Sequence, residues 1–161
     1  MSTHVPVPVE VSLPMDTRVS VIVARFNAHI TDILLAGCRQ RLEERGIDPP
    51  RIDVHSVPGA FELPTAAKLA AATKRYHAIV CLGCVIRGDT PHFDFVAGEA
   101  ARGIMRVSLD ESLPVIFGVL TTNTEEQAAA RAGGAHGHAG VHAADAALEM
   151  IGLTRKLRSG R

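Results

Sequence analysis

The chain has 161 residues, enough for one domain with its own core but too few for a second domain of ordinary size. Lysine plus arginine and aspartate plus glutamate both number 17, so the formal charge is zero and no basic stripe for nucleic acid or patch for a membrane is present. We therefore expect small-molecule ligands, with no nucleic acid and no membrane as partners.

The N-terminal segment predicts an extended arm. Residues 1–16 carry Pro6, Pro8 and Pro14, and proline cannot donate ladder hydrogen bonds, so this segment is expected to form an edge strand at most. It lacks the basic and apolar regions of a signal peptide, and no apolar run approaches the roughly 18 residues that span a bilayer. Three cysteines, an odd number, fit a reducing compartment. We expect a cytoplasmic protein with a single domain over residues 17–158.

The first half of that domain alternates strand and helix patterns. The apolar run at 18–24 predicts a strand, and the following helix is indicated by apolar residues at helical spacing and by Gly46 at its end. A second strand is predicted at 51–57, and "PGAFELPTAAKLAAATK" after it predicts a short alanine-rich helix. The apolar positions of the first helix are Ile30, Leu34, Cys38 and Leu42.

The second half repeats the alternation. Strands are predicted at 77–86 and 114–122, a helix lies between them, Asn123 with Glu126 three residues on predicts a further helix start, and a last helix begins at about residue 138. The helix between the strands places Phe93, Val96, Ala100, Ile104 and Val107 on one face, and the last helix does the same with Val141, Ala144, Leu148 and Ile151.

This βα alternation predicts the fold class. Each crossover must be right-handed and must cover the sheet, so helices are expected on both faces of a parallel sheet. We predict an α/β protein with a three-layer α/β/α sandwich around a central four-stranded parallel sheet, flavodoxin-like in arrangement. Within the third strand, Cys81 and Cys84 have C-x-x-C spacing, but strand positions three apart face opposite sides, which argues against a shared metal or disulfide.

The segment "AGGAHGHAGVHAA", residues 132–144, is predicted to be a loop between the last two helices. Its histidines His136, His138 and His142 have a spacing that a zinc site can use. A solvated glycine-rich loop is the alternative that the composition favours, and metal analysis of protein without an affinity tag distinguishes the two.

Unusual residues gather where parallel sheets bind ligands, at the carboxyl ends of the strands. Phe26 and Phe61 follow the first two strands and predict a platform for a flat ring, although either could instead plug the end of the core. Glu62 is placed to accept hydrogen bonds from a polyol, or to act as a favourable charge at a helix N-terminus.

The third strand end, "GCVIRGDTPHFDFV", combines two chemical signals. Gly88, Asp89 and Thr90 precede a helix N-terminus, where free N–H groups favour an anion such as phosphate, bound through the backbone and Thr90 because an inward Asp89 would repel it. His92 lies in the first helical turn, at the rim and not in the core, where an imidazole can give and take protons.

The order and spacing of "ARFN", "VPGAFELP", "GCVIRGDTPHFDFV", "PVIFGVLTT" and "EEQAAARAG" resemble the lumazine synthases, over residues 17–155. The resemblance implies condensation of 5-amino-6-(D-ribitylamino)uracil with 3,4-dihydroxy-2-butanone 4-phosphate to 6,7-dimethyl-8-ribityllumazine, the penultimate riboflavin step. It implies no cofactor and no metal. It also implies a homo-oligomer, either a pentamer or an assembly of pentamers, with riboflavin synthase as a candidate partner. A non-catalytic flavin- or lumazine-binding homologue is the alternative function.

The resemblance also implies site residues. Phe26 matches the ring-stacking position and His92 the proton-transfer position. Binding of the pyrimidine and its ribityl chain is implied for Ala60, Phe61, Glu62, Cys84, Val85 and Ile86, binding of the butanone phosphate for Asp89 and Thr90, and contributions from a neighbouring subunit for Phe117 and Arg131.

The sequence departs from the family at one position. Members commonly carry a lysine near residue 139, close to the phosphate, whereas this chain has Ala139 with His136 and His138 nearby. Either a histidine substitutes for the lysine or Arg131 binds the phosphate alone.

Overall fold

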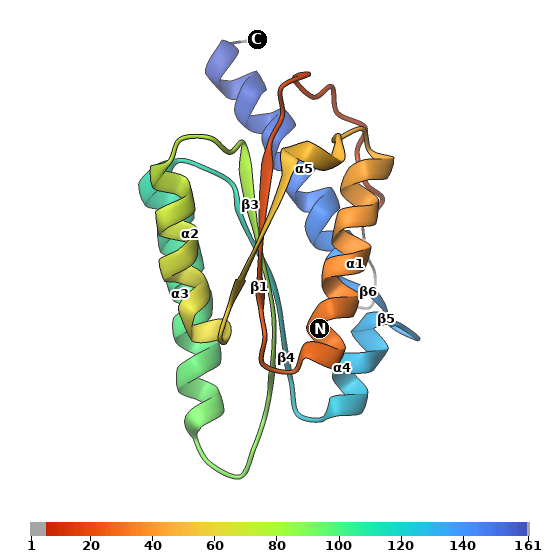
Figure 1. Ribbon diagram of the computed structural model, residues 1–161, viewed down its shortest axis with the longest axis vertical. Helices are drawn as coiled ribbons and strands as arrows, with labels where there is room; N and C mark the ends of the chain where they lie inside the picture. The colour runs from red at the N-terminus through yellow and green to blue at the C-terminus, as the bar shows by residue number, and fades with distance from the viewer. Residues whose placement is uncertain (1–5, 161) are drawn as a thin grey trace.

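Four parallel strands form the central sheet in the order β2-β1-β3-β4 (Figure 1). A computed structural model describes residues 6–160 of the chain. The strands span β1 Val19–Ala24, β2 Ile52–Val57, β3 Ala78–Ile86 and β4 Val115–Thr122. The first strand, β1, lies inside the sheet. β2 pairs with one side of β1, and β3 followed by β4 extends the sheet from its other side, as in flavodoxin-like folds.

Helices cover both faces of this sheet. Figure 1 shows α2 and α3 on one face and α1 and α5 on the other, with α4 beside the lower part of α1. Their bounds are α1 Ala28–Glu44, α2 Leu63–Ala72, α3 His92–Glu111, α4 Glu125–Arg131 and α5 Ala139–Ser159, with 3-10 turns at Pro49–Arg51 and Ala60–Glu62. The predicted three-layer α/β/α sandwich with a four-stranded parallel sheet is therefore confirmed.

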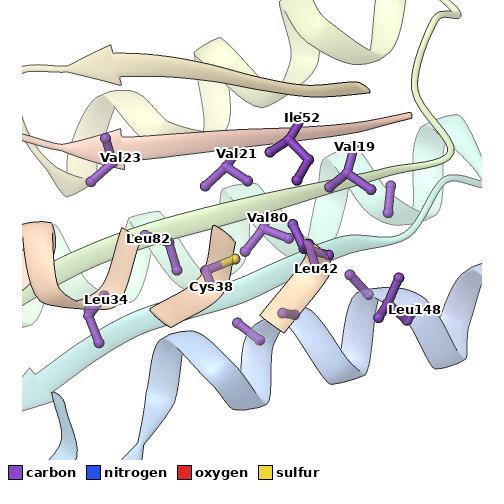
Figure 2. Packing of buried hydrophobic residues seen from close by; sticks show 14 of the residues in the cluster. Val19, Val21, Val23, Leu34, Cys38, Leu42, Ile52, Val80, Leu82 and Leu148 are labelled. Atoms are coloured by element: carbon purple, nitrogen blue, oxygen red, sulfur yellow. The ribbon is translucent and has the colours of Figure 1, made fainter. Parts of the chain in front are cut away.

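The strand period divides the core into two clusters, one on each face. Val19, Val21 and Val23 of β1 face α1 and α5, where they pack with the apolar stripe predicted for the first helix (Figure 2). Ile22 and Ala24 face α2 and α3. The same rule separates the two cysteines of β3: Cys84 belongs to the first cluster and Cys81 to the second, so the prediction that they do not share a site is confirmed.

The helix faces also follow the sequence pattern. Ile30, Leu34, Cys38 and Leu42 of α1 are all buried, and α1 ends before Gly46, which has a φ of 94°. A side chain at that φ would be strained, which explains why a glycine follows the helix.

Two boundary predictions were wrong. α4 is capped by Thr124 and not by Asn123: the Thr124 hydroxyl accepts a hydrogen bond from the Gln127 N–H at 3.3 Å, while the Gln127 side chain accepts one from the Asn123 N–H at 2.9 Å. The segment at 132–144 is not a plain loop. It contains a small antiparallel hairpin, β5 Ala132–Gly134 with β6 Gly137–His138, and then the start of α5.

The described part of the N-terminal segment, from residue 6, lies against α5 and forms no strand. The Val9 N–H donates to the Glu149 carboxylate at 2.8 Å, and Val11 packs closely on Gly152, where a larger residue would clash. Asp145 of α5 is buried and is paired with the guanidinium of Arg45, the residue that caps the C-terminus of α1, at 3.2 Å. The arm is thus attached to the α1–α5 layer, while the domain boundary at residue 17 stays a prediction.

Within residues 6–160, no helix is both long and apolar enough to cross a membrane.

Candidate active site

A cavity of about 580 Å³ opens at the carboxyl edge of the sheet. It lies between the ends of β1 and β3, where the order of strand addition reverses and where doubly wound sheets bind their ligands. Its volume falls within the range typical of sites for small organic molecules.

Most of the sequence-predicted site residues line this cavity. They come from the turns after β1 and β2, from the end of β3 and from the start of α3, and are Phe26, Ala60, Phe61, Glu62, Cys84, Val85, Ile86 and His92. The other four do not line it in this chain. Asp89 and Thr90 are exposed in the connection to α3, Phe117 lies on β4, and Arg131 is the last residue of α4.

The two phenylalanine rings are accessible from solvent. Phe26 is 72% exposed and Phe61 is 56% exposed, so neither ring plugs the end of the core. The backbone of Phe26 is fixed by a 3.0 Å hydrogen bond from its N–H to the Pro58 carbonyl, which ties the turn after β1 to the turn after β2. Both rings therefore offer apolar faces to a ligand in the cavity.

Gly59 allows these turns to approach each other. A Cβ at this position would come within 3.0 Å of the Phe26 ring and 3.3 Å of a Glu62 carboxylate oxygen. The same Glu62 oxygen accepts a 2.9 Å hydrogen bond from the Gly59 N–H. Glu62 thus stabilises the 3-10 turn that leads into α2 and also lines the cavity, while its binding of a polyol stays a prediction.

Asn27 is a cavity residue that the sequence analysis missed. It adopts a left-handed conformation with φ 57° and ψ 46°, and its side-chain amide donates to the Cys84 carbonyl at 3.0 Å. This bond ties the β1–α1 turn to the opposite wall of the cavity. Asparagine tolerates the left-handed region better than most residues, and that preference is the one signal that could have identified it.

Gly59, Phe95 and Val96 were also missed as lining residues. Phe95 is 68% exposed although it is aromatic, and it lies one turn of α3 after His92. An aromatic residue one turn after a predicted proton-transfer residue is a signal that the sequence contains. Its exposure is known only from the structure, because the sequence pattern alone does not distinguish it from a residue of the buried helix face.

His92 begins α3 and is exposed at the rim of the cavity. Its N–H lies 3.4 Å from the Thr90 hydroxyl, and the N-cap residue, Pro91, supplies no capping side chain to the first turn. The Asp94 N–H donates to the Pro91 carbonyl at 3.0 Å, which leaves the Phe93 N–H of this first turn available to an anion. The residue predicted to transfer protons therefore lies at the same helix start that is predicted to attract an anion.

The cavity wall formed by Cys84 is neutral. Burial, and secondarily the Glu125 carboxylate, raises the pKa of the Cys84 thiol to about 11. Burial raises the pKa of Cys38 and of Cys81 to about 12. None of these thiols is a nucleophile near neutral pH, so Cys84 contributes apolar surface to the cavity.

The histidines of the β5–β6 hairpin are not arranged as a metal site. Among the residues that the structure describes, no group of three or more His, Cys, Asp or Glu side chains is placed to hold an ion. His138 packs on Gly37 of α1, where a Cβ would come within 2.3 Å of its ring. Burial, with the neighbouring His142 as the second cause, lowers the pKa of His138. The zinc-module alternative is therefore not supported.

A comparison with known protein families agrees with this geometry. The family model described as 6,7-dimethyl-8-ribityllumazine synthase matches residues 16–155 of the 161-residue chain. The match includes every element of the sheet and every segment that lines the cavity. Members of this family are transferases that act on small molecules in riboflavin biosynthesis. Because the match extends over nearly the whole chain, we conclude that this protein belongs to the 6,7-dimethyl-8-ribityllumazine synthase family.

Proposed function

We propose that the protein condenses 5-amino-6-(D-ribitylamino)uracil with 3,4-dihydroxy-2-butanone 4-phosphate to form 6,7-dimethyl-8-ribityllumazine, the penultimate step of riboflavin biosynthesis. The observation that carries the proposal is a single cavity whose walls hold two exposed aromatic rings and whose rim carries His92. Flat-ring binding and proton transfer, the two needs of this reaction, are therefore met at adjacent places.

The pyrimidine is proposed to stack on Phe26, with the ends of β2 and β3 as the other walls of its site. The apolar wall consists of Ala60, Phe61, Cys84, Val85 and Ile86. Glu62 faces the same cavity and uses one carboxylate oxygen for the Gly59 N–H. Its other oxygen is proposed to accept hydrogen bonds from the hydroxyls of the ribityl chain.

The butanone phosphate is proposed to bind at the start of α3. Thr90 supplies a hydroxyl, and the first turn of the helix supplies the Phe93 N–H and a favourable dipole. Asp89 is proposed to contribute through its backbone, because its carboxylate would repel the phosphate. Arg131 of a neighbouring subunit is proposed to supply the positive charge, since the Arg131 of the same chain lies outside the cavity.

The proposed mechanism consists of proton transfers around two bond-forming steps. The pyrimidine amine attacks the butanone carbonyl, and loss of water gives a Schiff base. Phosphate then leaves by elimination, and the ribityl-bearing nitrogen adds to the remaining carbonyl and closes the second ring with loss of a second water. His92 is proposed to act as general acid and base, which contributes roughly 10²- to 10⁴-fold. Holding both reactants in one cavity contributes more, up to about 7–11 kcal/mol.

The site is proposed to be completed by oligomerisation, as a pentamer or an assembly of pentamers. Phe117 is 42% exposed on the edge strand β4, and Met105 and Leu109 of α3 are 60% and 70% exposed. A neighbouring subunit could cover these exposed apolar side chains in an oligomer. Phe117 and Arg131 are proposed to reach a neighbour's cavity across such a contact, and riboflavin synthase remains a candidate partner.

The proposed location is the cytoplasm. All three cysteines are buried free thiols, which fits a reducing compartment.

The test is direct. Purified protein is mixed with the two substrates in the presence of a metal chelator and without nucleotide, and 6,7-dimethyl-8-ribityllumazine is followed by its absorbance. We expect product to accumulate at a rate proportional to enzyme concentration. If folded protein forms no product but still binds riboflavin, the chain is a flavin- or lumazine-binding homologue and not an enzyme.

A further inference from the structure

The beginning of α3, which carries His92, has little support from the core. Every residue from 92 to 99 is exposed or only partly buried, and the first fully buried residue of the helix is Ala100. Figure 1 shows this end of α3 extending below the end of α2, where the connection from β3 enters. Apolar packing alone therefore does not fix the position of the His92 ring.

The side chain of Arg87 contacts that helix start directly. Its two terminal nitrogens donate to the two carboxylate oxygens of Asp94, at 2.8 Å and 3.3 Å. Its Cζ atom also lies 4.1 Å from the centre of the Phe93 ring. A two-pronged guanidinium–carboxylate contact fixes direction as well as distance, and stacking on an aromatic face adds a second constraint.

Arg87 is itself fixed to the sheet. Its backbone N–H donates to the Thr122 carbonyl at 2.9 Å, and its Nε donates to the Asn123 side chain at 3.2 Å. One residue thus joins the end of β3, the end of β4 and the first turn of α3. A lone surface ion pair contributes little to stability, but this one belongs to a network with defined geometry on three elements.

We propose that Arg87 is a positioning residue, which holds the first turn of α3 so that the His92 imidazole stays at the rim of the cavity. Arg87 does not line the cavity, so it acts through His92 and not on the substrate. The inference rests on the proposed function of His92, and it concerns a residue beyond those assigned to that function above.

The experiment compares Arg87→Gln with a matched control, an arginine variant in α3. Arg106→Gln also removes an arginine that pairs with an aspartate, since Arg106 Nε lies 3.4 Å from Asp110, but that pair is exposed and lies beyond the start of the helix. The double variant Arg87→Gln/Asp94→Asn is included because a released Asp94 carboxylate could pair with His92.

For both Arg87 variants we expect kcat to fall by about 10- to 100-fold, the loss typical of a misplaced catalytic group, while KM for the pyrimidine changes little. Amide hydrogen exchange without substrate should accelerate in residues 92–99 and stay unchanged from Ala100 onward. Arg106→Gln should leave kcat, KM and exchange at residues 92–99 as in the unaltered protein. Unchanged kcat and unchanged exchange in the Arg87 variants would overturn the inference.

A double-mutant cycle with His92→Ala separates positioning from direct action. If Arg87 works through His92, Arg87→Gln has little further effect on kcat once the imidazole is gone. An equal loss with and without His92 means that Arg87 acts on the substrate, and positioning is then wrong. If the unaltered protein makes no lumazine, the proposed function fails, whereas the positioning of the helix start is still decided by hydrogen exchange.

Discussion

At the scale of single residues, His92 carries the proposed proton transfers. We expect His92→Ala to lower kcat by roughly 10²- to 10⁴-fold, because that is the usual contribution of general acid–base catalysis. Product formation should remain measurable, since both reactants are still held together. The rate of lumazine formation is the measurement, and His55→Ala, at an exposed histidine of β2 outside the cavity, is the control. Unchanged turnover in His92→Ala would mean that the ring is only structural.

The residues that the sequence identified correctly as cavity residues share one property. They lie at or shortly after the carboxyl ends of strands, and the strand pattern predicts that these ends meet, while the resemblance to the family supplied Ala60, Cys84, Val85 and Ile86. Asn27 was not identified from the sequence, because its position in the cavity depends on a backbone φ of 57° and on a hydrogen bond to the carbonyl of Cys84, far away in the chain. The tolerance of asparagine for that φ is a weak local signal, and the bond to Cys84 has no local sequence pattern. The substrate-binding and catalytic roles assigned above to the cavity residues stay predictions.

At the scale of elements, helix faces were more predictable than element ends. Burial of one face follows from apolar spacing, which is why the stripes of α1 and α5 were found before the fold was known. The observed cap of α4 lies one residue after the predicted one, because Asn123 with Glu126 and Thr124 with Gln127 are competing capping patterns. The hydrogen bonds of Gln127 favour the second pattern. The β5–β6 hairpin was missed because strands this short have no measurable period.

The α1–α5 layer depends on a buried charge. Asp145 of α5 is only 6% exposed and is paired with Arg41 of α1 at 3.3 Å and with the C-cap residue Arg45 at 3.2 Å. We expect Asp145→Asn to lower the free energy of unfolding by about 2 kcal/mol, because the charge that pairs with Arg41 and accepts the Arg45 hydrogen bond is lost while the shape is kept. Urea unfolding measures this. Asp110→Asn, which affects an exposed pair on α3, should change stability by less than about 0.5 kcal/mol.

The contact between the β5–β6 hairpin and α1 should respond to pH. The folded state lowers the pKa of His138 below its usual value of 6.5, so the unfolded chain binds more protons when the pH falls through that value. His138 therefore contributes full stability above pH 6.5 and loses it progressively as the pH falls toward its folded pKa. The neighbouring groups on α1 are Arg41 and Glu44, and His142 lies on α5.

We expect unfolding free energies measured in urea from about pH 8 to about pH 5 to decline less steeply for His138→Gln than for the unaltered protein. His136→Gln, in the same hairpin but exposed, should retain the original slope. A His138→Gln protein with an unchanged slope would show that the buried imidazole is not the group responsible.

At the scale of the whole molecule, the proposed neighbour contributions require a ring with head-to-tail contacts. Mixing His92→Ala and Arg131→Ala subunits one to one, after dissociation and random reassembly, produces some cavities with both intact residues. For independent choice, about a quarter of the cavities are intact, so activity should rise toward about a quarter of that of the unaltered protein. The rate is measured on assemblies whose mixed composition and size are verified by mass.

Activity at the average of the two single variants, in rings shown to be mixed, would mean that His92 and Arg131 serve the same chain's cavity. In this chain Arg131 lies outside the cavity that His92 borders, so that outcome would also require α4 to move. The size of the assembly, measured in the same experiment, distinguishes free pentamers from larger shells.

The strand order has a consequence for how the protein folds. β1 pairs with β3 in the centre of the sheet, with Val19 opposite Ala78, and the chain between them contains β2 and two helices. Closing so long a loop costs entropy before the pairing contributes stability, so formation of this central pair is expected to be a slow event. Two walls of the cavity are formed at the ends of these same strands. During synthesis, the ligand site therefore cannot be completed until β3 has left the ribosome. A nascent chain that ends before β3 contains Phe26 and Phe61 but lacks the cavity wall that Cys84, Val85 and Ile86 form.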